Sequence, residues 1–380
     1  MRKKSILILS ATAGAGHVRA AEALEASAKI SFPSVAVRHE DILTYTFPLF
    51  KKAYSQGYFA IVNKSPELWG YLYKRSEFKG PSKNKSPLMK VFDHFNYKKY
   101  IKTLHDLKPD AVLCTHFLPY LSIADEIKKP SWRIPFFAAV TDYDAHSLWI
   151  NSSVTRFYVA TEETRWTLQS HNIAHDNIAV TGIPVMPEFG KHVSKRSARV
   201  KMELSSTAFT IMILSGGYGV GVIDELVPSV IEFVSRLKHK EFQILVVCGK
   251  NRRLFETLNR LSFPKNVHVK LFQYVSFVDT LMDCADLLIT KSGGLTVSEA
   301  LAKNLPMIIF DPIPGQEARN ADYITEHGAA IRAINLINLN FKIQQLIEQP
   351  VLLMKMRSNA KTIAKPLAAE KILKDIIQQI

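Results

Sequence analysis

The stretch of chain with the clearest chemistry is residues 291–320, KSGGLTVSEALAKNLPMIIFDPIPGQEARN. Ser292, Gly293 and Gly294 have no side chain large enough to keep a ligand away from the backbone. Residues 295 to about 304 have the pattern of a helix, whose free N–H groups and positive dipole end would point back at this turn. Such a helix terminus binds anions, so the sequence predicts a diphosphate site here.

The same stretch also carries polar side chains that could hold a sugar. Glu299 falls one turn into the expected helix, on a face from which its carboxylate could reach a ribose. A buried strand is expected at 307–310, followed by a polar loop with Gln316 and Glu317 at its tip. Both features favour a ligand that joins a diphosphate to sugars.

A second glycine-rich turn, SGGYGVG at residues 215–221, follows the first strand of the second half of the chain. Its glycines and their neighbours, Gly217, Tyr218 and Gly219 among them, would let a phosphate or sugar approach the backbone closely. No Lys-Ser or Lys-Thr pair follows, so this is not an ATP-binding P-loop. Together with residues 292–294 it predicts a two-sided diphosphate cradle.

The first strand of the chain is followed by TAGAGHVRAA at residues 12–21. Gly14 and Gly16 allow a tight turn before a helix, but Arg19 stands where a dinucleotide fingerprint needs its third glycine. An NAD site is therefore disfavoured. His17 remains at a helix start beside the carboxyl end of a strand, where α/β folds place ligands, and is a candidate catalytic residue.

Asp142 and Asp144 form a DxD pair after the expected strand at 136–141. Such a pair can hold a divalent metal, but the tripeptide is common by chance, and the helix terminus already supplies positive charge. We therefore expect no metal site and no cofactor, and interpret Asp142 as a second candidate catalytic residue. No HxxxH, HExxH or comparable cluster in the sequence offers a better metal site.

Apolar runs recur along the chain with helix-length spacers between them. The expected strands are 5–10, 111–114, 136–141, 156–160, 210–214, 243–248, 267–271, 287–290 and 307–310. Continuous Val/Ile/Leu runs are typical of parallel sheets covered on both faces, and this alternation predicts doubly wound α/β domains. A basic stretch at 186–201 is expected as the linker. The predicted domains are 1–190 and 191–365, and an amphipathic helix at 366–380 is expected to pack back on the first domain.

Length and composition limit the class of protein. The chain has 380 residues, of which 47% are hydrophobic, and this suits two globular domains. The three cysteines have no CxxC spacing, which fits a reducing cytosol better than a disulfide scaffold or structural zinc. The first apolar run is too short for a signal peptide, and no run approaches the roughly 20 residues of a membrane span. We expect a cytoplasmic protein, at most attached peripherally to the cytoplasmic face of the membrane.

The net charge of +15 is unevenly distributed. Residues 51–108 hold 13 Lys or Arg against 4 Asp or Glu, together with many aromatic residues. Such a mixture suits anionic lipid headgroups or nucleic acid, although a solvated face with ordinary core aromatics has the same composition. We favour an anionic membrane surface and expect no nucleic-acid partner. The residues expected to meet the acceptor or the membrane are Gly14, Gly16, Lys51, Lys52, Trp69, Tyr73, Lys74 and Arg75.

These motifs, taken in order, resemble the monogalactosyldiacylglycerol synthase and processive diacylglycerol glucosyltransferase family, relatives of the peptidoglycan glycosyltransferase MurG. The resemblance covers nearly the whole chain. It rests on GAGH at 14–17, PELWGYLY at 66–73, VTD at 140–142, TGIPV at 181–185, SGGYGVG, CGKN at 248–251, SGGLTVSEA and PGQE. It implies a GT-B fold, in which two Rossmann-like domains face a cleft, and an inverting transfer from a UDP-hexose to a diacylglycerol-type lipid. The PxPGQE form is nearer the bacterial glucosyltransferases, which favours glucose over galactose.

The resemblance also implies roles for individual residues. Main-chain N–H groups of 292–296, Leu295 and Thr296 included, would bind the diphosphate, and Glu299 would accept hydrogen bonds from the ribose. Gln316 and Glu317 would hold the hexose. The region around the uracil would comprise Gly249, Lys250, Asn251, Tyr274 and Val275.

The general base is the part of the site that the resemblance leaves open. Plant members of the family have an acidic residue five places before the GAGH histidine, where this chain has Thr12, so a base there is not carried over. His17 and Asp142 remain as candidates. Two other classes stay open: a MurG-like or epimerase-like enzyme with another substrate, and a non-catalytic protein that responds to nucleotide sugars. The basic aromatic segment favours a lipid acceptor over an epimerase, and the presence of both His17 and Asp142 argues against a pure binder.

Overall fold

The computed structural model describes residues 3–12, 14–54, 65, 67–68, 70–71, 74–75, 87–214, 216, 223–238 and 240–380, with only the backbone described for 87–95. The chain divides into two compact units. The first comprises Met1–Pro187, Pro314–Gln316 and Lys365–Ile380, and the second comprises Glu188–Ile313 and Glu317–Ala364. The domain bounds of 190 and 365 remain a sequence-based prediction.

The first unit is built on a parallel sheet of six described strands in the order β2-β1-β3-β4-β5-β6. The strands are β1 Ser5–Ser10, β2 Ala36–Asp41, β3 Ala111–Cys114, β4 Phe136–Ala139, β5 Arg156–Val159 and β6 Ile178–Val180. Strand β1 lies between β2 and β3, so the chain adds β2 on one side of β1 and then crosses to add β3 on the other side. The carboxyl end of β1 is therefore a switch point of the topology.

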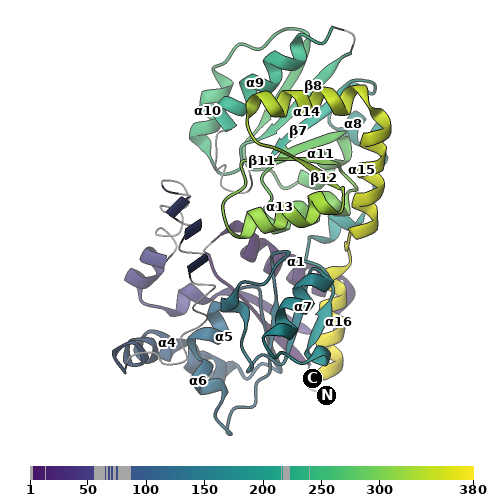
Figure 1. Cartoon of the computed structure of the whole chain (residues 1–380). Coiled ribbons are helices and arrows are strands. Elements are labelled where there is room, and N and C mark those ends of the chain that lie inside the picture. Colours follow the sequence, from purple (N-terminus) through teal and green to yellow (C-terminus); the bar gives the residue numbers. More distant parts are fainter. Residues whose placement is uncertain are drawn as a thin grey trace. The chain divides into compact units, whose positions relative to one another are not determined.

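Helices cover both faces of this sheet. They are α1 Ala15–Ser31, α4 Pro87–Leu107, α5 Leu118–Ser122, α6 Ala124–Ile127, α7 Glu162–Ser170 and α16 Ala368–Gln379. Side chains alternate across the strands, so that Ile6 and Ile8 pack with α1 and α16, while Leu7 and Leu9 belong to the core of the opposite face. Helix α16 brings the carboxyl end of the chain beside its start, where Lys4 Nζ donates to the Ile377 carbonyl at 2.8 Å (Figure 1).

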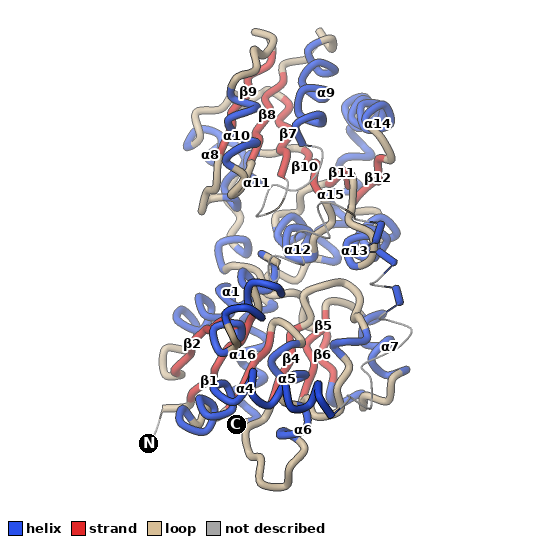
Figure 2. Tube along the Cα trace, turned by 90° about the vertical axis from the view of Figure 1, so that its left-hand side faces the viewer, coloured by secondary structure: helices blue, strands red, loops and turns tan. Residues whose placement is uncertain are grey.

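The second unit repeats the plan with the order β12-β11-β10-β7-β8-β9. Its strands are β7 Phe209–Leu214, β8 Phe242–Val247, β9 Val267–Phe272, β10 Leu287–Thr290, β11 Met307–Phe310 and β12 Ala330–Ala333, and all described pairs are parallel. Figure 2 shows these strands in red with helices in blue around them. The switch point here lies between β7 and β10.

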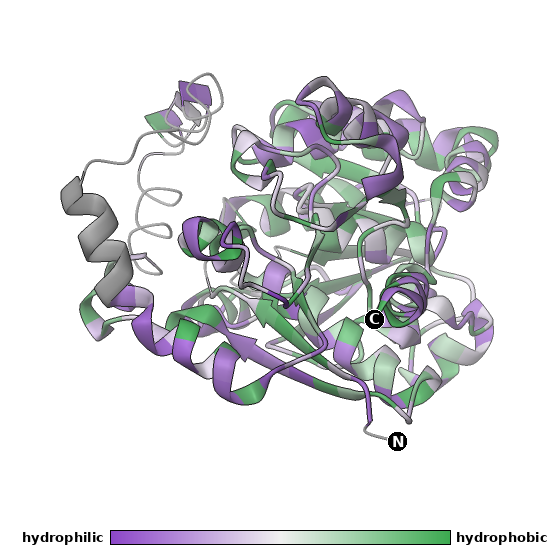
Figure 3. Ribbon diagram, turned by 90° about the horizontal axis from the view of Figure 1, so that it is seen from below, coloured by the Kyte–Doolittle hydropathy of each residue, from purple (hydrophilic) through white to green (hydrophobic). Residues whose placement is uncertain are grey.

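The helices of this unit are α8 Lys195–Lys201, α9 Ile223–Ser235, α10 Arg252–Asn259, α11 Val278–Cys284, α12 Gly294–Ala302, α13 Gln316–Glu326, α14 Leu336–Glu348 and α15 Pro350–Ile363. Helices α9 and α14 share one hydrophobic core with β7, β8, β10 and β11. Helix α11 packs against α8, and α12 packs against α15. In Figure 3 the central strands are coloured hydrophobic, whereas many helices show both hydrophobic and hydrophilic residues.

The predicted fold class is confirmed, because both sheets are parallel and covered by helices. Three strands were not expected: β2, β6 and β12 are edge strands of their sheets, and each contains residues that are only partly buried or exposed. The predicted linker is wrong for residues 195–201, which form α8. Within α8, Arg199 is 3% exposed and its guanidinium reaches Asp286 at 2.9 Å and the Cys284 carbonyl at 3.0 Å.

Candidate active site

The two glycine-rich turns of the second unit begin side by side. Strand β10 pairs with β7 so that Thr290 lies opposite Leu214, and the Thr290 hydroxyl donates to the Leu214 carbonyl at 2.7 Å. The loops that follow these strands therefore leave the sheet together at its switch point, where doubly wound folds bind ligands. Three predicted residues of the first loop, Gly217, Tyr218 and Gly219, lie outside the described residues, so this half of the cradle remains a prediction.

Helix α12 begins as the diphosphate prediction requires. Its first residue is Gly294, one position before the expected start, and Gly293 is the N-cap. No side chain caps this end and no acidic residue lies in the first turn of α12, so no residue of the helix itself neutralises the positive end of its dipole. Leu295 and Thr296 occupy the first turn and are partly exposed. The helix terminus is thus available to an anion.

The hydroxyl of Ser292 has a structural task. The side chain is buried, and its Oγ donates to the Glu317 carbonyl at 2.6 Å. The Ser292 carbonyl accepts a hydrogen bond at 2.9 Å from Nδ2 of Asn320, which is itself fully buried. Ser292 therefore ties the turn after β10 to helix α13. Asn320 was not identified from the sequence.

Gln316 and Glu317 form the first turn of α13, so the prediction that they lie at a loop tip is wrong. The loop before the helix is closed by Glu317, whose Oε2 accepts a hydrogen bond from the Ile313 N–H at 2.8 Å. Gly315 has φ of 102°, a conformation that favours glycine and turns the chain into the helix. The other carboxylate oxygen, Oε1, would lie 3.7 Å from a Cβ added at Gly293. The structure therefore brings Glu317 next to the predicted diphosphate turn.

Glu299 lies on α12, in the turn after the diphosphate turn, and is 7% exposed. Because the Glu299 side chain is nearly buried, a ribose could contact only the small part of it that reaches the surface. The prediction that Glu299 contacts ribose is compatible with this position, since a nearly enclosed carboxylate makes strong, directional hydrogen bonds.

The residues expected around the uracil lie after two paired strands. Val247 at the end of β8 lies opposite Phe272 at the end of β9, which brings residues 248–251 and 272–275 to the same edge of the sheet. Tyr274 is 53% exposed, and Lys250 Nζ lies over its ring, 5.7 Å from the centroid. Val275 beside it is partly buried, and Gly249 has φ of 59°.

Asn251 has a structural role, and its place near the uracil remains a prediction. Its side-chain oxygen accepts the Leu254 N–H at 3.0 Å and caps the start of α10. This bond fixes the turn that carries Gly249 and Lys250. Asn251 therefore positions its neighbours through the backbone of α10.

In the first unit, His17 lies in the first turn of α1, beside the ends of β3 and β4. Its Nδ1 is 2.8 Å from the Thr115 carbonyl oxygen and 2.9 Å from the Thr141 hydroxyl. The Thr115 hydroxyl donates in turn to the His17 carbonyl at 2.8 Å. Gly14, the N-cap of α1, has φ of 156°, which places the preceding turn close to this ring. Gly16 lies within the first turn of the same helix.

These hydrogen bonds determine the tautomer of His17. A carbonyl oxygen can only accept, so Nδ1 must carry the proton that it donates to Thr115. In the neutral ring the lone pair is then on Nε2, the atom that can accept a proton from a substrate. Burial lowers the pKa of His17, while the charge of Asp142 and the hydrogen bond to Thr115 raise it, with a net lowering. His17 is therefore neutral near pH 7.

A second histidine, not identified from the sequence, lies against His17. The ring of His116 meets that of His17 edge-on with centroids 4.6 Å apart, and its Nδ1 accepts the Leu118 N–H at 3.0 Å. Burial, and the positive charge that His17 would carry, hold the pKa of His116 well below its usual value. A neutral His116 adds no charge beside His17. The signal was available, because Thr115 and His116 directly follow an expected strand.

Asp142 lies near His17, close enough for its charge to act on the imidazole, and is partly exposed. The two candidate catalytic residues are thus brought together. Asp144 is directed elsewhere, because its Oδ1 accepts the Ala145 N–H at 2.8 Å and lies 3.5 Å from the Thr167 hydroxyl. In the described part of the chain, no group of three or more His, Cys, Asp or Glu side chains could hold a metal ion.

Thr12 is bound to a carboxylate that the sequence did not reveal. Its hydroxyl donates to Asp41 Oδ2 at 2.6 Å, and Asp41 Oδ1 also accepts the Leu43 N–H at 3.0 Å. Asp41 ends β2, the strand next to β1. An acidic group therefore lies beside position 12 although the residue there is a threonine.

The expected acceptor and membrane residues are only partly described. Lys51, Lys52, Lys74 and Arg75 are exposed, whereas Trp69 and Tyr73 lie outside the described residues. Several aromatic residues of the same segment belong to the core instead, as Tyr97 and Tyr100 are at most 2% exposed. No described helix is long and apolar enough to cross a membrane.

Family models match both halves of the chain. A model for monogalactosyldiacylglycerol (MGDG) synthase matches residues 17–185, and one for the glycosyltransferase family 28 C-terminal domain matches residues 210–380. Processive diacylglycerol beta-glucosyltransferases are similar over almost the full length. The protein from Bacillus cereus is 30% identical over 100% of this chain and 95% of its own length, and that from Bacillus subtilis is 28% identical over 99% and 95%.

Solved structures show the same fold at lower identity. MurG from Acinetobacter baumannii aligns over 100% of both chains with a TM-score of 0.64 and 16% identity. The S. aureus MnaA structure with UDP aligns over 97% of this chain and 95% of its own, with a TM-score of 0.64 and 14% identity. The predicted GT-B fold is therefore confirmed. With 30% identity over its full length to a processive diacylglycerol glucosyltransferase, the chain belongs to the monogalactosyldiacylglycerol synthase and processive diacylglycerol glucosyltransferase family of glycosyltransferases.

Proposed function

We propose that this protein transfers a hexose, glucose in preference to galactose, from a UDP-sugar to the hydroxyl of diacylglycerol or of a glycosyldiacylglycerol, with inversion at the anomeric carbon. The full-length relatives named processive diacylglycerol beta-glucosyltransferase support the substrate class. The observation that carries the catalytic part is the hydrogen bond from His17 Nδ1 to the Thr115 carbonyl, which leaves Nε2 as a base.

In the proposed reaction, His17 Nε2 removes the proton of the lipid hydroxyl as its oxygen attacks the anomeric carbon. The new C–O bond forms on the face opposite UDP, and the bond to the β-phosphate oxygen breaks. Asp142 stabilises the imidazolium that forms, because its charge raises the pKa of His17. General-base assistance of this kind contributes typically 10²–10⁴-fold.

The departing UDP gains negative charge as the bond breaks. The uncapped start of α12 supplies fixed N–H groups and a positive dipole end to the diphosphate, and preorganised dipoles of this kind are a large term in catalysis. This mechanism has no metal-dependent step. We expect transfer to survive EDTA, and a complete loss that Mn²⁺ reverses would instead make Asp142 and Asp144 metal ligands.

We place the reaction on the cytoplasmic face of the membrane, with the protein attached peripherally to anionic lipid. The support is the set of exposed cations Lys51, Lys52, Lys74 and Arg75, together with Leu49, an apolar side chain that is 80% exposed close to the first pair. Cations near an anionic surface contribute about 1 kcal/mol each.

Purified protein mixed with diacylglycerol vesicles and either UDP-glucose or UDP-galactose tests the proposal. Mass spectrometry should find hexosyl-diacylglycerol, formed faster from UDP-glucose. A change in the nucleotide sugar without lipid product would indicate an epimerase, and UDP-sugar binding without any product would indicate a binding protein. Product only with a polyprenyl lipid would indicate MurG-like specificity.

A further inference from the structure

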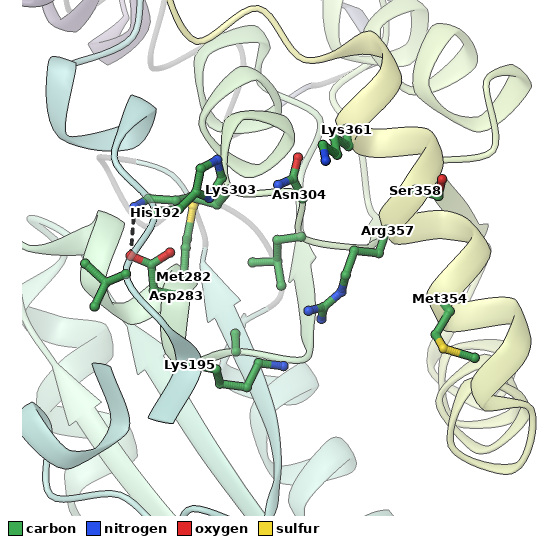
Figure 4. A pocket seen from close by; sticks show the side chains of 13 residues that line it. His192, Lys195, Met282, Asp283, Lys303, Asn304, Met354, Arg357, Ser358 and Lys361 are labelled. Atoms are coloured by element: carbon green, nitrogen blue, oxygen red, sulfur yellow. Dashed lines mark hydrogen bonds and ion pairs between the residues drawn. The ribbon is translucent and has the colours of Figure 1, made fainter. Parts of the chain in front are cut away.

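A cavity in the second unit lies away from the donor residues. It has a volume of about 440 Å³ and is bounded by the loop before α8, the ends of α11 and α12, and one face of α15 (Figure 4). Ala285 and Leu305, which line it, lie two residues before the starts of β10 and β11, whereas the diphosphate turn follows β10. Four residues of strand separate the two ends, about 13 Å. The cavity therefore lies at the amino ends of these strands and is separate from the diphosphate turn at the carboxyl end.

The cavity has an apolar floor and cationic walls. Met282, Ala285 and Leu305 are at most 2% exposed and form the floor. Among the lining residues, the carboxylate of Asp283 is outnumbered by four cations, Lys195, Lys303, Arg357 and Lys361, and His192 lies at the edge. A volume of this size is in the range of small-molecule sites.

Two of these cations already have structural partners. Lys303 is buried, with Nζ 2.7 Å from Asp283 and 2.6 Å from the Lys191 carbonyl. Lys195 pairs with Asp286, the carboxylate that also binds Arg199. These contacts hold the walls together and leave Arg357 and Lys361 as the uncompensated charges.

Arg357 and Lys361 lie one turn apart on α15 and form no ion pair or hydrogen bond with any residue that the structure describes. In Figure 4 the Arg357 guanidinium and the Lys195 ammonium are directed toward one another, and Lys361 lies beside Asn304. Burial lowers the pKa of Lys195, Asp286 raises it, and the charge of Arg357 lowers it further. The converging cations repel each other, so a bound anion would relieve the repulsion.

Helix ends oppose this positive field only in part. The C-termini of α11 and α12 adjoin the cavity at Ala285 and Lys303, and each is equivalent to roughly −0.5 charge. Together they offset about one of the full positive charges. The cavity therefore keeps a net positive potential.

We infer that this cavity binds a small, soluble, phosphate-bearing anion, held by Arg357 and Lys361 with Lys195 beside them and with its non-phosphate part on the apolar floor. A guanidinium binds phosphate through paired hydrogen bonds, and an ammonium adds a point charge. Several converging cations favour a multiply charged phosphate over a monovalent anion.

Titration calorimetry with inorganic pyrophosphate tests this inference, in the presence of saturating UDP so that the donor site is occupied. Wild-type protein should bind pyrophosphate under these conditions, and binding should weaken as salt is added. Arg357→Gln and Lys361→Gln should each weaken binding by about 10- to 100-fold, as expected for loss of a charge-assisted hydrogen bond. Lys355→Gln removes the same charge from an exposed position on the same helix and should change little.

Several results would overturn the inference. No heat of binding in the presence of UDP, or an equal loss in Lys355→Gln, would leave only a general surface charge. Citrate binding as tightly as pyrophosphate would remove the phosphate preference. Dependence of anionic vesicle binding on Arg357 and Lys361, with no pyrophosphate binding, would make the cavity a lipid contact. Circular dichroism on each variant confirms folding, which these substitutions should preserve because neither side chain has a described partner.

Discussion

Replacing His17 with Gln removes the proposed base while keeping a side chain that can hydrogen-bond to its surroundings. The Gln amide can still donate toward the Thr115 carbonyl, which lies 2.8 Å from His17 Nδ1 in the wild type. Most of the contribution of that hydrogen bond to folding stability is therefore retained. The lone pair at Nε2 has no equivalent in the variant. Loss of general-base assistance predicts a kcat lower by 10²–10⁴-fold, equivalent to about 2.7–5.5 kcal/mol in the activation barrier.

Steady-state transfer from UDP-glucose to diacylglycerol vesicles measures this loss, and calorimetry measures UDP affinity in parallel. UDP affinity should be unchanged, because the residues predicted to bind the diphosphate and the ribose, 292–296 and Glu299, lie in the other unit. His39→Gln is the matched control, since His39 lies on β2 of the same unit and its Nε2 is 2.9 Å from the Ser10 hydroxyl. It should keep near-normal kcat.

The pH dependence gives an independent check on the same residue. His17 acts as a base only when it is neutral, and its pKa is lowered from 6.5. As the pH is lowered, wild-type kcat/KM should therefore stay constant to pH 6.5 and decrease only below that pH. The Gln variant should not show this decrease of kcat/KM at acid pH. A kcat within about threefold of wild type, or an unchanged acid limb in the variant, would refute the role of His17.

The remaining predictions concern the donor site, the membrane and stability. Glu299→Ala should weaken UDP and UDP-glucose binding alike by about 1.5–3 kcal/mol, measured by calorimetry, and unchanged UDP affinity would remove Glu299 from the site. Gln316→Ala should slow transfer while sparing UDP affinity, because UDP has no hexose; equal losses would mean another role. Arg199→Met should lower the free energy of unfolding in urea by about 1.5–3 kcal/mol, because Asp286 loses one of its two cationic partners and keeps Lys195, whereas Lys201→Met on the same helix should cost little. Co-sedimentation with anionic vesicles should be lost, and UDP binding kept, when four exposed cations are changed together to Gln; normal sedimentation would place the membrane contact elsewhere. These four are Lys51, Lys52, Lys74 and Arg75.

The sequence predicted the central strands well because their burial is continuous. Runs such as Phe209–Leu214 are buried at every position, and apolar at all of them except Thr210, because the strand is covered on both faces. The edge strand Ala36–Asp41 gave no such signal, because four of its six residues are polar and it is only partly buried, and its pairing with β1 is a tertiary effect. Missing that strand also meant missing Asp41 beside Thr12.

The candidate site was predictable where a motif follows a strand. His17 and Asp142 were identified from their positions after the first and fourth strands of the sheet, and the structure brings them together. The partners that set the tautomer and surroundings of His17, the Thr115 carbonyl and His116, come from another strand end. A single sequence without contacts cannot assign backbone acceptors to a side chain. The start of α13 at Gln316 could not be predicted from the sequence either. The hydrogen bond from the Ile313 N–H to Glu317, which closes the preceding loop, forms only in the folded chain.

The most direct test of the central claim is the structure of the lipid product. Protein incubated with UDP-α-glucose and diacylglycerol vesicles should yield glucosyl-diacylglycerol, and proton NMR of the purified lipid should show the β-anomer. That result is predicted because attack on the face opposite UDP inverts the anomeric carbon. An α-linked product, or no glycolipid although UDP-glucose binds, would contradict the account.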